Sequence, residues 1–103
     1  MAFDRLNRIM PDLIREMAED VALDIENEID EFVLLVHEGQ VFQSQVPRFV
    51  YYESTHPDLR SYLEILETKG FIQMVSAGPT PIYRLMENFR AGLSAVQGDQ
   101  SQE

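Results

Sequence analysis

Apolar residues recur at helical spacing along the first third of the chain. From Phe3 to Val33 they follow one another every three or four residues, which is the repeat of an amphipathic helix. Pro11 suits the first turn of a helix and Gly39 suits a carboxyl-terminal cap. The pattern therefore predicts a main helix over residues 11–38, preceded by a short helical arm over 2–9.

A single helix over residues 11–38 would extend roughly 42 Å, which exceeds the width of a domain this small. Two alternatives follow. The helix projects toward a partner, or it breaks near Asp24 and Asn27, since both residue types cap helices well.

The clearest helix signal lies in the second half of the chain. Thr55 and Asp58 form a capping box, Pro57 suits the first turn, and Gly70 suits the carboxyl-terminal cap. The positions between them match one apolar helical face in full, with Leu59, Tyr62, Leu63 and Leu66. A helix over residues 57–69 is predicted.

The hydrophobic period changes after Gly70. Residues 71–75 and 82–86 read as two strands, and the Gly-Pro turn chemistry between them predicts a hairpin. Before the capped helix, Pro47 favours a short helix within residues 46–54. After the hairpin, Phe89, Leu93 and Val96 predict a short closing helix, and residues 97–103 read as a disordered tail.

The sequence YLEILETKGFI over residues 62–72 resembles the end of the recognition helix in bacterial winged-helix regulators. Residues 82–85, Ile-Tyr-Arg-Leu, are similar to the strand after the wing in the multiple-antibiotic-resistance and PadR-type regulators. The resemblance implies an α+β, mostly helical winged helix-turn-helix fold with a long amino-terminal helix, a small β-hairpin wing and a short carboxy-terminal helix.

On this interpretation residues 1–96 form one domain. An amino-terminal helical arm (1–24) leads into a winged core (25–86) and a closing helix (87–96). The resemblance also implies DNA binding, with helix 57–69 in the major groove and the wing at 76–81 beside it.

Charge is distributed unevenly along the 103 residues. The chain carries a net charge of −10, and eight acids and no base lie between residues 16 and 31. Such a field repels phosphate and disfavours generic nucleic-acid binding. The acids 16–31 are expected to form a solvated helix face, with a docking surface for a basic protein partner as the alternative.

The predicted recognition helix departs from the residues that normally read base edges. Its outward face presents Asp58, Ser61, Glu64, Ile65 and Thr68, where Arg, Lys, Asn or Gln would be expected. If the chain binds DNA, four bases are the candidates for phosphate contacts: Arg48, Arg60, Lys69 and Arg84.

Few residues offer catalytic or metal-binding chemistry. There is no cysteine, and neither His37 nor His56 has a second histidine at ligand spacing. No serine lies in a nucleophile-elbow context, and no phosphate loop is present. We therefore expect no enzyme activity, metal or cofactor. No apolar run reaches the ~18 residues of a membrane span, which favours the cytoplasm.

The long apolar stripe exceeds what a small winged core could cover. It therefore predicts a homodimer, because exposed apolar surface of this extent calls for a partner. The expected interface residues are Met10, Leu13, Ile14, Met17, Val21, Phe89 and Leu93. The favoured function is a non-enzymatic, dimeric regulatory or adaptor protein that acts through protein contacts, and the alternative is a DNA-binding transcriptional regulator.

Overall fold

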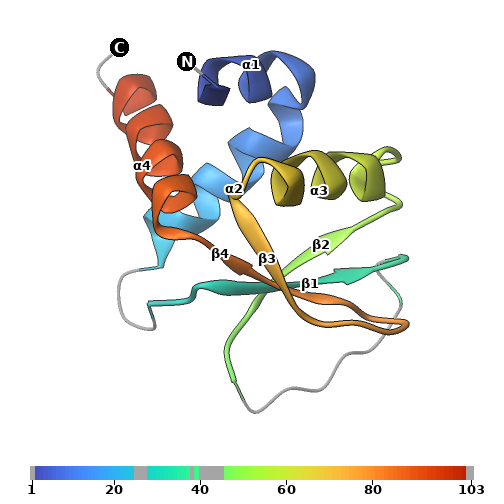
Figure 1. The fold of residues 1–103 in the computed structure, drawn as a ribbon. Helices are drawn as coiled ribbons and strands as arrows, with labels where there is room; N and C mark the ends of the chain where they lie inside the picture. Colours follow the sequence, from blue (N-terminus) through green and yellow to red (C-terminus); the bar gives the residue numbers. More distant parts are fainter. Residues whose placement is uncertain (1, 25–27, 38, 40–45, 102–103) are drawn as a thin grey trace.

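The computed structural model describes residues 2–24, 28–37, 39 and 46–101. These residues form four helices and four strands (Figure 1). In chain order they are α1 (Ala2–Ile9), α2 (Pro11–Leu23), β1 (Glu31–Leu35), β2 (Phe49–Tyr52), α3 (Leu59–Thr68), β3 (Ile72–Ser76), β4 (Ile82–Leu85) and α4 (Glu87–Ser101).

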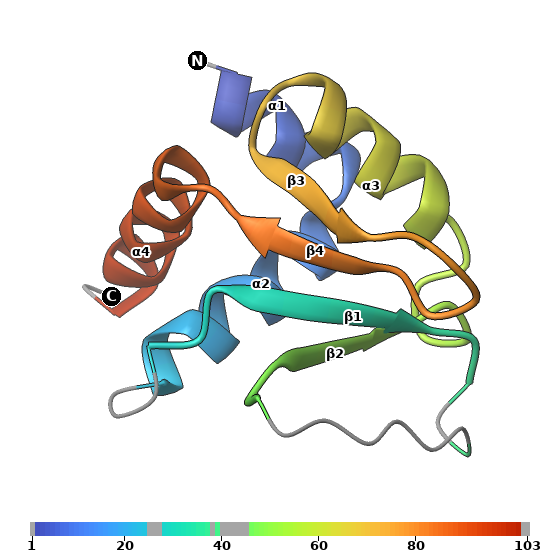
Figure 2. The same ribbon diagram turned by 60° about the horizontal axis from the view of Figure 1, so that its bottom comes forward.

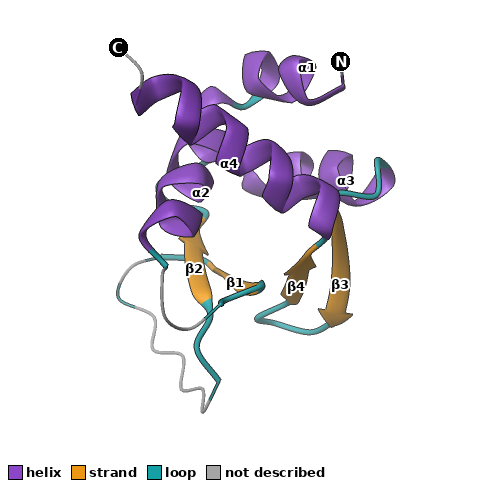
Figure 3. Cartoon of the chain, turned by 90° about the vertical axis from the view of Figure 1, so that its left-hand side faces the viewer, coloured by secondary structure: helices purple, strands orange, loops and turns teal. Residues whose placement is uncertain are grey.

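The four strands form one mixed sheet in the order β2-β1-β4-β3 (Figure 2). β1 pairs in parallel with β2 and antiparallel with β4, and β3 pairs antiparallel with β4. The helices gather on one side of this sheet (Figure 3). The fold is therefore α+β, as the sequence predicts.

The core lies between the sheet and the helices. Phe32 of β1 lies between two aromatic rings, with its centroid 5.3 Å from Tyr51 of β2 and 5.2 Å from Tyr83 of β4. Because side chains alternate along a strand, Leu34 shares the face of Phe32, and both are buried in the core. α2 and α4 pack against each other over this layer.

The helix predicted over residues 57–69 is found as α3 and the hairpin is confirmed, but the predicted capping box is wrong, because the N-cap of α3 is Asp58 and it makes no side-chain cap hydrogen bond. α3 ends in a Schellman motif, in which the Phe71 amide donates to the Leu66 carbonyl and the Gly70 amide donates to the Glu67 carbonyl. This geometry needs the left-handed φ of 79° at Gly70, which glycine adopts without a Cβ penalty. β3 and β4 then pair antiparallel, with Met74 opposite Tyr83.

A continuous helix over residues 11–38 is wrong beyond Leu23, and the alternative of a break near Asp24 is confirmed. α2 ends there, and the Asp24 amide bonds to the carbonyls of Asp20 and Val21. Residues 31–35 form β1, whose Phe32–Leu35 stretch is buried on both faces of the sheet. A strand buried on both faces lacks the alternation that identifies strands, and here its apolar run continued the helical spacing by coincidence. Asn27 lies outside the described residues.

The short helix predicted within residues 46–54 is also wrong. Phe49–Tyr52 is strand β2, because its β-branched and aromatic residues fit the pleated surface beside β1. A strand thus takes the place expected for the first helix of a helix-turn-helix, and the winged-helix topology is not confirmed. The closing helix is longer than predicted, since α4 continues to Ser101 through part of the expected tail 97–103.

Candidate functional site

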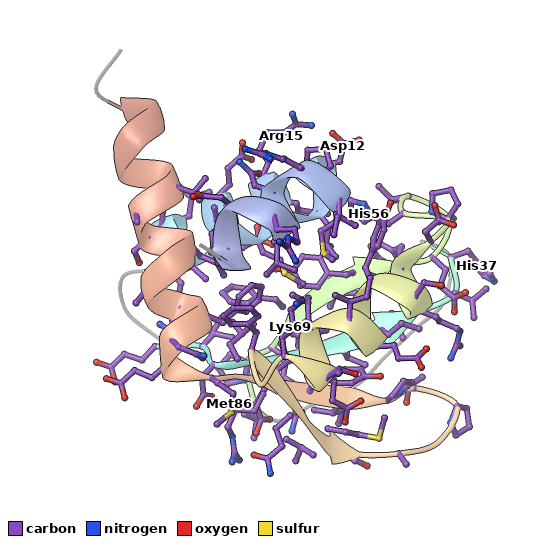
Figure 4. The ribbon with its side chains drawn as sticks, turned by 45° about the horizontal axis from the view of Figure 1, so that its top comes forward. Asp12, Arg15, His37, His56, Lys69 and Met86 are labelled. Carbon is purple, nitrogen blue, oxygen red and sulfur yellow. The ribbon has the colours of Figure 1, made fainter. Side chains whose placement is uncertain are left out.

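Two acids on α2 bind two side chains of a later segment, one from β2 and one from the residues that follow β2. Glu16 Oε1 lies 2.5 Å from His56 Nε2, and the Tyr51 hydroxyl donates to Asp20 Oδ2 at 2.9 Å. Glu16 and Asp20 are one helical turn apart, so they face the same way. His56 and Tyr51 are both buried, and Figure 4 shows His56 reaching toward α2. We call Glu16, Asp20, Tyr51 and His56 the polar clamp.

In the polar clamp, the pKa values of both Tyr51 and Asp20 are raised. Burial raises the pKa of Asp20, the hydrogen bond from Tyr51 lowers it, and the nearby carboxylates of Glu16 and Glu19 raise it further, for a net increase. Burial also raises the pKa of Tyr51 well above its usual range, and Asp20 adds to the rise. Tyr51 therefore stays a neutral hydrogen-bond donor, which is a structural role.

Other acids between residues 16 and 31 also bond to groups of the same chain. Asp24 accepts a hydrogen bond from the Ile29 amide at 2.5 Å. Glu31 binds Arg48 at 2.9 Å and Arg84 at 3.4 Å. The predicted solvated face is thus only partly realised. Glu19, Glu28 and Asp30 are exposed as expected, and Glu26 lies outside the described residues.

The four bases proposed for DNA contact do not meet on one surface. Arg48 and Arg84 share Glu31, on the sheet face opposite the helices, and Arg60 of α3 binds Glu53 at 2.7 Å. Lys69 lies at the end of α3, on the helix side. Three of the four cations therefore lie against a carboxylate, two of them sharing Glu31, and the set is split between two sides of the sheet.

The residues expected at a dimer interface lie inside the single chain. Six of the seven are at most 1% exposed: Met10, Leu13, Ile14, Met17, Phe89 and Leu93. Val21 is partly buried and packs against the same core. The sheet and α4 cover the apolar stripe of the amino-terminal helices, which a small winged core would have left exposed. The stripe is therefore no longer evidence for a second subunit.

Among the described strands, β3 is the one that exposes large apolar side chains; Ile9, Leu23, Val36 and Val46 are exposed outside the strands. This edge strand is buried only at Ile72, and Met74 and Val75 are 39% and 45% exposed. By contrast β2, the other edge strand, is buried or half-buried at all four positions. One signal for this surface is visible in the sequence: β3 carries apolar residues on both faces and no charge. The sequence predicted the strand but not its exposure. Exposure depends on the order in which the strands pair, and the local sequence does not contain that order.

Four hollows lie on the surface of the described residues, and one of them, about 460 Å³, lies on the outward face of α3 beside Ser61, Glu64 and Ile65. The largest, about 650 Å³, lies between residues 28–30 and the start of α4, and its wall includes Glu28, Asp30 and Glu87. Two smaller ones, about 350 Å³ and 90 Å³, flank His56. Across the described part of the chain, no three His, Asp or Glu side chains are placed to hold a metal ion.

No family model, curated protein or solved structure is significantly similar to the chain. The winged-helix resemblance therefore has no support from a known relative. Among the described helices, none is long and apolar enough to cross a membrane.

Proposed function

We propose that this chain is a non-enzymatic regulatory or adaptor protein that acts through protein–protein contacts. The observation that carries the proposal is the exposed, uncharged apolar surface of β3, where Met74 and Val75 are open to solvent. An exposed edge strand without charged residues is a ready template for pairing with another chain.

The distribution of the bases supports protein contacts over DNA contacts. Specific DNA binding draws much of its free energy from several cations that meet phosphates and release counterions. Arg48, Arg60 and Arg84 each lie against a carboxylate, and the whole chain carries −10. The transcriptional-regulator alternative is therefore the weaker proposal.

The homodimer expected from the sequence is not part of this proposal. A dimer built on Met10, Met17 or Phe89 would first have to expose residues that hold the core together. The proposed species is a single chain that binds other proteins, with the cytoplasm as its expected location.

Affinity capture from an extract of the source cells, treated with nuclease, tests the proposed function. We expect the immobilised chain to retain a small set of proteins, and duplex DNA to bind no tighter than about 10⁻⁴–10⁻⁶ M at physiological salt. The proposal fails if nuclease removes every captured protein. It also fails if a fluorescence-anisotropy titration gives nanomolar, sequence-dependent DNA affinity.

A further inference from the structure

We draw no further inference here: the strongest candidate, the outer edge of β3 around Met74 and Val75, carries nothing beyond the proposed function, because nothing in the structure shows what covers it.

Discussion

Replacing Met17 with Glu should unfold most of the protein. Met17 is 0% exposed on α2, within the cluster that joins the helices to the sheet. A carboxylate there has to be desolvated or protonated, and we expect a cost on the order of 4 kcal/mol or more. Domains of this size have about 5–15 kcal/mol of total stability. Urea unfolding followed by circular dichroism measures the loss.

Leu23→Glu is the matched control on the same helix. Leu23 is 79% exposed, so the same kind of substitution should cost about 1 kcal/mol at most, from the unfavourable charge near the helix end. Sedimentation equilibrium of the wild type should give the single-chain mass of 11.9 kDa. A wild type of twice that mass, which Met17→Glu converts into a folded single chain, would restore the dimer interface and contradict this packing.

Tyr51→Phe should destabilise the protein by about 1–3 kcal/mol at neutral pH, because it leaves the part-buried Asp20 carboxylate without its donor. The Tyr51 hydrogen bond lowers the pKa of Asp20, so its removal should raise that pKa further above 3.8. The ¹³C chemical shift of the Asp20 carboxyl, followed through a pH titration, reports this directly.

The sign of the pH dependence follows from the raised pKa of Asp20. A carboxyl with a raised pKa binds its proton more tightly in the folded state, so its contribution favours folding at low pH. That contribution is lost as the pH rises from the unfolded value of 3.8 through the folded pKa. The deficit of Tyr51→Phe relative to the wild type should therefore shrink at acidic pH.

Two neighbouring substitutions control for this interpretation. Tyr52→Phe removes a hydroxyl from the opposite face of the same strand, and we expect a change within about 0.5 kcal/mol. Asp20→Asn keeps an oxygen acceptor for Tyr51 without the charge, so it should stay close to wild-type stability and lose this pH dependence. Equal losses from Tyr51→Phe and Tyr52→Phe would contradict a specific role for the clamp.

Local signals sufficed for the second half of the fold. The apolar face of α3 and the Gly70 cap are encoded within one stretch of chain, and so is the change of period that begins the hairpin. β1 and β2 are different, because their placement depends on pairing between residues 31–35 and 49–52, which no local pattern reveals. Burial on both faces also removed the alternation that would have marked β1.

The same limit applies to the surface. The sequence shows that Glu16, Asp20 and Glu31 are acidic, but their partners His56, Tyr51 and Arg48 lie 17 to 40 residues away. The acids of residues 16–31 were therefore predicted to face solvent, although several of them bond to side chains of the same chain. In the same way, the stripe around Met17 looked uncovered because the extent of the sheet was not known. The exposure of β3 follows only from the strand order.

Site-specific photo-crosslinking in the source cells tests the central claim most directly. A photoreactive amino acid at Met74 should crosslink the chain to another protein, whereas the same group at Leu23, which is more exposed, should not. Mass spectrometry of the Met74 product should identify that protein. Crosslinking at Leu23 but not at Met74, or a product that contains nucleic acid, would contradict a protein-binding role for the β3 edge.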